Sequence, residues 1–128
     1  MKIYFARSIN GDRGDTGIYE QIISLLGEHG EVLTEDTILG KDVEPSYVFE
    51  RDGDWIRDAD VVVAEVTIPS LGVGYEIGLA ESLEKRILCI YREKEDERLS
   101  SMIAGNRNLS IAQYENISDL ENIFTDFF

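Results

Sequence analysis

Five short apolar runs, separated by longer segments of mixed polarity, constrain the fold of this chain more than any other feature. Each run has the length of a β-strand, and between the runs apolar residues recur at helical spacing. Strands that alternate with helices are typical of βαβ units, in which the strands are parallel. The predicted strands are residues 2–6, 31–34, 61–66, 86–91 and 109–114, and the predicted helices are residues 16–29, 47–58, 72–84, 97–103 and 118–127.

The third and fourth runs are continuously apolar, as expected for central strands that helices cover on both faces. We therefore predict an α/β fold over residues 1–128 as one domain: a doubly wound, five-stranded parallel sheet of the flavodoxin or Rossmann-like kind, with order 2-1-3-4-5. Such sheets bind ligands at the carboxyl ends of their strands, near the switch point. Three loops meet this description, at residues 7–17, 35–46 and 67–74.

Acidic residues outnumber basic ones by 26 to 12, which gives a formal net charge of -14. This charge repels nucleic-acid polymers and anionic membranes, so neither is an expected partner. It does not exclude a small anionic ligand, because distant charges are screened within about 10 Å and local amides and arginines then dominate.

The amino terminus shows no export signal, and no stretch approaches the roughly 20 apolar residues of a membrane span. The single cysteine, Cys89, lies within an apolar run, so neither an internal disulfide nor a cysteine metal cluster is expected. These features predict a cytoplasmic protein that binds no metal.

Residues 69–78 pass from a predicted strand into a predicted helix and contain glycines that let the backbone approach a ligand. Their spacing matches a dinucleotide-binding fingerprint only in part, and they follow the third strand rather than the first. We therefore expect no nicotinamide or flavin cofactor.

Glu76 interrupts an apolar helical face that it shares with Val73, Ala80 and Leu83. Burial would raise the pKa of this carboxyl, whereas a place in the first turns of a helix favours its charged form. The alternative is a helix-start glutamate that binds backbone amides.

Asp52 presents the same choice, since it shares a face with Val48 and Ile56 if the helix runs from residue 47. Gly53 weakens that interpretation, and the pattern slightly favours an Asp52 that caps a helix beginning just after it.

Tyr4 lies on the first predicted strand, where its hydroxyl could orient a carboxylate or where the residue could serve as an ordinary core tyrosine. Two inward carboxylates and a tyrosine suit glycosidic chemistry, in which one group attacks the anomeric carbon and another assists the leaving group or water. A serine–histidine–aspartate triad is disfavoured, because the single histidine, His29, falls at the end of the first helix, far from the expected ligand edge.

Two segments, ADVVVAEVT at residues 59–67 and PSLGVGYE at residues 69–76, resemble those of the 2′-deoxynucleoside 5′-monophosphate N-glycosidases, relatives of the nucleoside 2-deoxyribosyltransferases. The likeness runs nearly end to end. It implies that Glu76 is the nucleophile, that Tyr4 orients it and that Asp52 is the acid or base. The implied reaction is retaining: Glu76 attacks C1′, a free nucleobase leaves, and water hydrolyses the covalent deoxyribosyl 5-phosphate ester.

The resemblance also implies a homodimer in which Ser100 completes the partner's phosphate site, and it implies a nucleotide substrate without a cofactor. The substrate-binding positions that it implies are Arg7, Ser8, Ile9, Asn10, Gly11, Asp12, Arg13, Tyr19, Asp36, Ser70, Gly72, Ser100, Ser101 and Met102.

Four of these positions differ from the family. Arg7 and Asp12 stand where glycine is usual, Asn10 where arginine is usual, and Asp36 where histidine is usual. The preferred nucleobase and the strictness for the 5′-phosphate and the deoxy sugar therefore stay open. Two other functions stay open as well: base exchange on unphosphorylated deoxynucleosides, and a non-catalytic nucleotide-binding module.

Overall fold

A computed structural model describes residues 1–9, 16–35, 43–94 and 98–128 of the chain. Strands and helices alternate along these residues, as predicted, and the bounds of the strands agree with the predicted ones to within one residue. The elements are β1 (Lys2–Ala6), α1 (Thr16–Leu26), β2 (Glu31–Leu33), α2 (Pro45–Asp58), β3 (Val61–Glu65), α3 (Leu71–Ser82), β4 (Arg86–Tyr91), α4 (Ser101–Ala104), β5 (Ser110–Gln113) and α5 (Ile117–Phe127).

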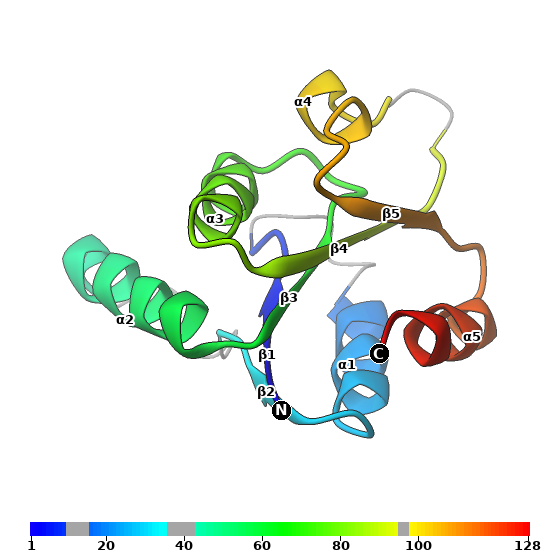
Figure 1. Cartoon of the computed structure of the whole chain (residues 1–128), viewed down its shortest axis with the longest axis horizontal. Coiled ribbons are helices and arrows are strands. Elements are labelled where there is room, and N and C mark those ends of the chain that lie inside the picture. The colour runs from blue at the N-terminus through cyan, green and yellow to red at the C-terminus, as the bar shows by residue number, and fades with distance from the viewer. Residues whose placement is uncertain (10–15, 36–42, 95–97) are drawn as a thin grey trace.

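The strands form one parallel sheet of order β2-β1-β3-β4-β5, which confirms the predicted fold. The chain first moves outward from β1 to β2 and then crosses back over β1 to reach β3 (Figure 1). The switch point therefore lies between the neighbouring strands β1 and β3, where Tyr4 pairs with Val62.

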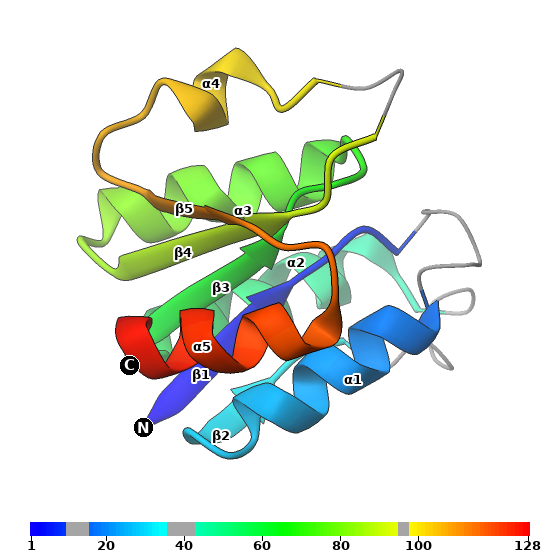
Figure 2. The same ribbon diagram turned by 90° about the vertical axis from the view of Figure 1, so that its right-hand side faces the viewer.

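Helices cover both faces of the sheet: α2 and α3 lie on one face, and α1 and α5 lie on the other (Figures 1 and 2). Because side chains alternate along a strand, Ile3 and Phe5 pack toward α1 and α5, whereas Tyr4 and Ala6 pack toward α2 and α3. The pleat of β1 thus directs Tyr4 to the face on which the candidate site lies.

Two predicted helices differ from the observed ones by three or more residues at one end. The helix predicted at residues 16–29 ends at Leu26, because the backbone N–H groups of Glu28 and His29 donate to carbonyls only three residues back and tighten the last turn. The helix predicted at residues 97–103 begins only at Ser101, because the hydroxyl of Ser100 caps it by accepting from the N–H of Met102 at 3.2 Å.

A buried carboxylate joins the carboxyl ends of β3, β4 and β5. Glu65, 1% exposed, accepts hydrogen bonds from the hydroxyl of Tyr114 and from the backbone N–H of Thr67, the latter at 2.6 Å. The hydroxyl oxygen of Thr67 accepts in turn from the backbone N–H of Arg92 at 2.9 Å. These bonds hold the start of the loop that leads from β3 to α3.

Within the described ranges, no helix has both the length and the apolar character that a bilayer crossing requires.

Replacing Tyr114 with phenylalanine should lower the free energy of unfolding by about 1–3 kcal/mol, because the change removes a donor from a buried carboxylate. The matched control is Tyr91→Phe on β4. The hydroxyl of Tyr91 makes a hydrogen bond of 3.4 Å with Gln113 near the surface. Its removal should lower the free energy of unfolding by less than about 0.5 kcal/mol. Urea unfolding followed by circular dichroism measures both variants. Equal losses in the two variants would show that Glu65 does not depend on the Tyr114 hydroxyl.

Candidate active site

A cleft of about 430 Å³ opens between α2 and α3, beside the carboxyl ends of β1 and β2. All three loops that the sequence singled out contribute to it, through Arg7 and Ile9, through Glu35, and through Ser70 and Gly72. One wall is apolar, and its residues include Val43, Pro45, Val48, Phe49, Ile56, Val73 and Leu79. The polar groups gather where this wall meets the strands, and the cleft therefore lies at the predicted edge of the sheet.

Glu76 and Tyr4 meet inside the cleft. Ser70 caps α3 by accepting from the N–H of Val73 at 3.3 Å, so the helix begins at Leu71 and Glu76 falls in its second turn. The hydroxyl of Tyr4, a residue only 2% exposed, donates a hydrogen bond to Oε2 of Glu76. Glu76 is thus bonded to a side chain across the switch point rather than to the amides at the start of its own helix.

The surroundings of Glu76 raise the pKa of its carboxyl to near neutral pH. Burial raises the pKa of this carboxyl to about 7, and the hydrogen bond from Tyr4 opposes that rise by stabilising the carboxylate. The charges of Asp52 and Glu35 raise the pKa further, while Arg51 lowers it. Burial first, and the nearby carboxylate second, raise the pKa of Tyr4, so its hydroxyl stays protonated and remains a donor.

Asp52 lies in the middle of α2, and the interpretation as a helix cap is therefore wrong. The helix begins at Pro45, whose fixed backbone angle suits the first turn, and it continues through Gly53 to Asp58. Asp52 is 9% exposed, shares the buried face with Ile56 and lines the cleft opposite α3. The sequence placed this carboxylate on an inward face only as one of two alternatives.

Sequence reasoning missed two residues beside Asp52. Arg51 donates from Nε to Oδ1 of Asp52 at 3.1 Å and from Nη2 to Oε1 of Glu35 at 2.9 Å. Its guanidinium lies 4.7 Å above the ring of Trp55, which helps to fix its orientation. The position of Glu35, directly after the second strand and at the start of a loop already expected to border the site, was the signal that could have found it.

Glu35 is a second carboxyl whose pKa is raised to near neutral pH. Burial raises its pKa to about 7, and the hydrogen bond and charge of Asp52 contribute to the rise. Arg51 and Arg7 act in the opposite direction. The cleft thus holds three carboxyl groups within mutual electrostatic influence.

The structure describes only some of the residues that are predicted to bind the phosphate. Ser70, Gly72, Arg7 and Ile9 line the cleft, and Arg7 donates from Nη2 to the backbone oxygen of Glu35 at 2.6 Å. Ser8 is buried directly after β1. The remaining predicted positions, Asn10, Gly11, Asp12, Arg13 and Asp36, lie outside the described residues.

Tyr19 is not among the described residues that line the cleft. It is buried on the opposite face of the sheet, where its ring packs edge-on against Phe5 and lies under the guanidinium of Arg7 at 5.5 Å. Tyr19 thus contacts two residues that line the cleft, Phe5 and Arg7.

The three predicted positions near α4 do not reach the cleft of their own chain. Ser100 and Met102 line a second hollow of about 510 Å³ between α3 and residues 98–106, and Ser101 is exposed beside them. Ser70 belongs to both hollows, which therefore meet at the start of α3.

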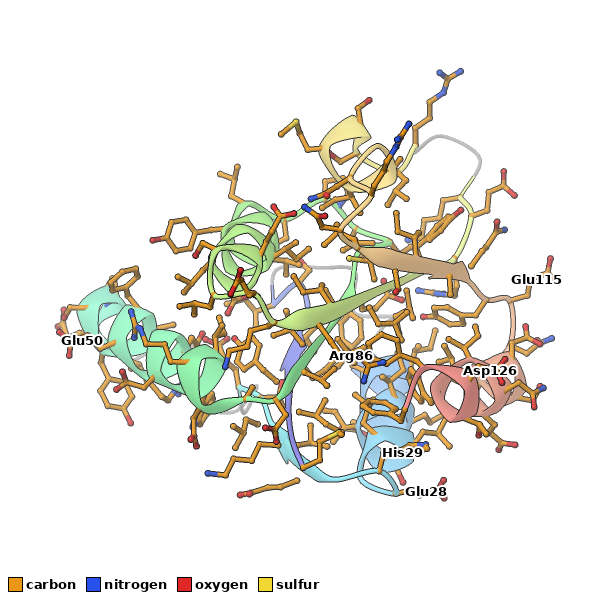
Figure 3. The ribbon with its side chains drawn as sticks, in the orientation of Figure 1. Glu28, His29, Glu50, Arg86, Glu115 and Asp126 are labelled. Atoms are coloured by element: carbon orange, nitrogen blue, oxygen red, sulfur yellow. The ribbon has the colours of Figure 1, made fainter. Side chains whose placement is uncertain are left out.

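His29 follows α1 (Figure 3), packs against Phe124 and Phe128 near the carboxyl terminus, and is not among the described residues that line the cleft. The ring of His29 stacks on that of Phe128, with 4.7 Å between the ring centroids, so the residue serves in packing. Across the described parts of the chain, no three His, Cys, Asp or Glu side chains gather in a way that could hold a metal ion.

Known proteins resemble this chain over nearly its whole length. The nucleoside 2-deoxyribosyltransferase family pattern matches residues 3–119. The 5-hydroxymethyl-dUMP N-hydrolase of Tetraodon nigroviridis is 41% identical over 140 residues, a match that covers 100% of this chain and 97% of that protein.

Two solved structures share the fold. The CMP N-glycosidase of Clostridium botulinum superposes with a TM-score of 0.77 at 22% identity and covers 100% of both chains. The 2-deoxyribosyltransferase of Bacillus psychrosaccharolyticus superposes with a TM-score of 0.73 at 23% identity, covering 99% of this chain and 96% of that one. From the extent of the family match and the identity to the N-hydrolase, the chain belongs to the nucleoside 2-deoxyribosyltransferase family.

Proposed function

We propose that this protein hydrolyses the N-glycosidic bond of a 2′-deoxynucleoside 5′-monophosphate to free nucleobase and 2-deoxyribose 5-phosphate. The observation that carries the proposal is a pair of carboxyls, the half-buried Glu76 and the buried Asp52, that face one cleft from two helices, with the Tyr4 hydroxyl on Glu76. The relative from Tetraodon nigroviridis, which is named for hydrolysis of such a nucleotide, supports the choice of reaction and substrate class.

In the first step Glu76 acts as the nucleophile. Tyr4 holds Oε2, and Oε1 forms a bond to C1′ of the sugar as the bond from C1′ to the base nitrogen breaks. The electron pair of the broken bond goes to the nucleobase, which takes a proton from Asp52. The products of this step are the free base and a glutamyl ester of deoxyribose 5-phosphate.

In the second step water attacks C1′ and displaces the Glu76 carboxylate. Asp52, now ionised, takes the proton that the water loses, and both carboxyl groups return to their starting forms. Positive charge develops on the sugar in both steps, and the carboxylates that line the cleft stabilise it because they are already in place and partly shielded from water.

The remaining surfaces of the cleft suit the rest of the nucleotide. The apolar wall on α2, with Val48 and Phe49, suits the flat faces of a nucleobase. The start of α3, where Ser70 and the first N–H groups of the helix lie, suits the phosphate, and Arg7 is the nearby cation. In a chain of net charge -14, such local donors must supply the attraction for an anion.

We also propose that the active form is a homodimer in which Ser100 reaches the partner's site. Leu71, 97% exposed, and Met102, 82% exposed, border the hollow that meets the cleft at Ser70. Large apolar side chains this exposed are typical of a surface that a partner covers.

A cytoplasmic location is part of the proposal. The single cysteine, Cys89, is buried and its pKa is raised to about 12 by burial, as expected of a thiol that stays reduced and unpaired.

A substrate panel tests the function. The panel contains 2′-deoxynucleoside 5′-monophosphates, including 5-hydroxymethyl-dUMP, their ribonucleotide counterparts and the unphosphorylated deoxynucleosides, and chromatography quantifies base and sugar phosphate. We expect equal amounts of both products from a deoxynucleoside monophosphate. Removing the 5′-phosphate should lower kcat/KM at least about tenfold, because each bond to a charged group contributes about 1.5–3 kcal/mol.

Glu76→Gln should lower turnover by at least about a thousandfold, because the amide keeps the size of the side chain but cannot form the ester. Glu50→Gln, an exposed change on α2, is the control. Base exchange with an added second base, without sugar phosphate, would identify a transferase instead, and binding without turnover would identify a non-catalytic module.

Tyr4→Phe should move the acid limb of the pH profile of kcat/KM to higher pH by about one unit, since the lost bond stabilises the ionised form of Glu76. The reaction needs Glu76 ionised, so activity at pH 7 should fall. Tyr75→Phe is the matched control. Tyr75 also lines the cleft, but it is 60% exposed and has no role in the proposed mechanism. A uniform loss of activity at every pH, without movement of the limb, would assign Tyr4 to packing alone.

Mixing Glu76→Ala and Ser100→Ala chains tests the shared site. A mixed dimer has one site with both native residues and one site lacking both, so random exchange should restore about one quarter of the sites. Native mass spectrometry measures the exchange while activity is followed. If exchange is complete, Ser100→Ala alone is impaired and activity merely averages the two variants, then Ser100 serves its own chain.

A further inference from the structure

We propose that Glu35 and Asp52, bridged by Arg51, share one proton, and that this pair rather than Asp52 alone supplies and recovers the proton of the reaction. The proposal rests on the proposed N-glycosidase function, and it assigns a role to a carboxyl group that the mechanism above leaves unused.

The geometry brings the two carboxyls to one guanidinium. Arg51 reaches Glu35 from Nη2 at 2.9 Å and Asp52 from Nε at 3.1 Å, although the acids come from the end of β2 and from the middle of α2. All three side chains are largely shielded, with exposed fractions of 16% for Arg51, 17% for Glu35 and 12% for Asp52. The rings of Trp55 and Tyr47 flank the guanidinium at 4.7 and 5.6 Å and hold its orientation.

The charges around this arrangement favour one retained proton. The groups that face Glu35 are Arg7 beyond β1, Arg51 and Asp52 on α2, and, at longer range, Tyr4 and Glu76. Arg51 and Arg7 offset part of the negative charge of the pair, and Arg7 also donates from Nη2 to the backbone oxygen of Glu35. Two neighbouring carboxyls in such a site titrate as a unit, and the first to ionise makes the second hold its proton more tightly.

A shared proton meets a requirement of the reaction. Glu76 must be ionised to attack while an acid must still carry a proton for the leaving base, and an isolated exposed carboxyl is ionised at neutral pH. The rise of the Glu35 pKa to about 7, caused by burial and by Asp52, keeps the proton available at the pH at which Glu76 ionises.

Every proton is accounted for over the two steps. As the bond from C1′ to the base breaks, the one proton of the pair passes from Asp52 to the base, and both carboxyls are left ionised beside Arg51. When water attacks C1′, its proton passes to Asp52 and is again shared with Glu35. The pair therefore begins and ends each turnover with one proton, and no further reactant is needed.

The first test compares the pH profiles of kcat for wild type, Glu35→Gln and Glu50→Gln. Glu50 is the matched control, because it is a glutamate on α2 that points away from the sheet into solvent (Figure 3). In Glu35→Gln the alkaline limb should move to lower pH, since the remaining carboxyl loses its negative neighbour and gives up its proton more readily, and kcat above pH 7 should fall at least about tenfold. Glu35→Asp should recover part of the alkaline limb, and Glu50→Gln should leave both limbs in place. A Glu35→Gln profile that is lowered equally at every pH would overturn the catalytic role.

The second test needs no turnover. Carbon NMR of chains with labelled glutamate carboxyls should show Glu35 titrating near pH 7 in wild type and at lower pH in Asp52→Asn, where the charge and hydrogen bond of Asp52 are gone. Identical midpoints would overturn the shared proton. If no nucleotide in the panel releases base, the proposed function fails on that result, while this titration still decides whether the pair exists.

Discussion

The hydrogen bond between Tyr4 and Glu76 is the contact on which the arrangement of the site depends. It joins the central strand β1 to helix α3 across the switch point of the sheet. Two local features have to agree for it to form: the pleat of β1 must turn Tyr4 toward α2 and α3, and the Ser70 cap must start α3 so that Glu76 falls in its second turn. Because both features belong to the rigid frame, the carboxylate is held in place before any ligand binds.

The site concentrates negative charge in a partly buried cleft, which lowers the stability of the fold. Glu35, Asp52 and Glu76 lie within mutual influence, and Arg51 bridges the first two. Isolated carboxylates in such a place would be strongly destabilising. Hydrogen bonds and the guanidinium groups of Arg51 and Arg7 reduce this effect, and the pKa values of Glu35 and Glu76 are raised to about 7. In the proposed mechanism, the raised pKa values let these carboxyls serve as nucleophile and acid at neutral pH.

A second tyrosine–glutamate hydrogen bond lies outside the cleft among the described residues. Glu65 accepts from Tyr114 as Glu76 accepts from Tyr4, yet Glu65 also holds the backbone N–H of Thr67 and is only 1% exposed. It stabilises the loop after β3, which leads to the Ser70 cap, and it does not line the cleft among the described residues. The first pair belongs to the proposed chemistry, and the second supports the element that positions it.

The sequence by itself determined the sheet, its order and the face of α3 on which Glu76 lies, because apolar periodicity and strand length are properties of residues close together in the chain. It left Asp52 undecided, since a glycine beside a short polar residue is compatible with either a cap or a helix interior, and only the start of α2 at Pro45 settled the matter. Glu35 and Arg51 escaped notice because their partnership joins residues 16 positions apart on different elements. Such contacts form only when the helix packs on the sheet, and their pKa values follow from that burial, so the tertiary structure alone decided which acidic residues became one site.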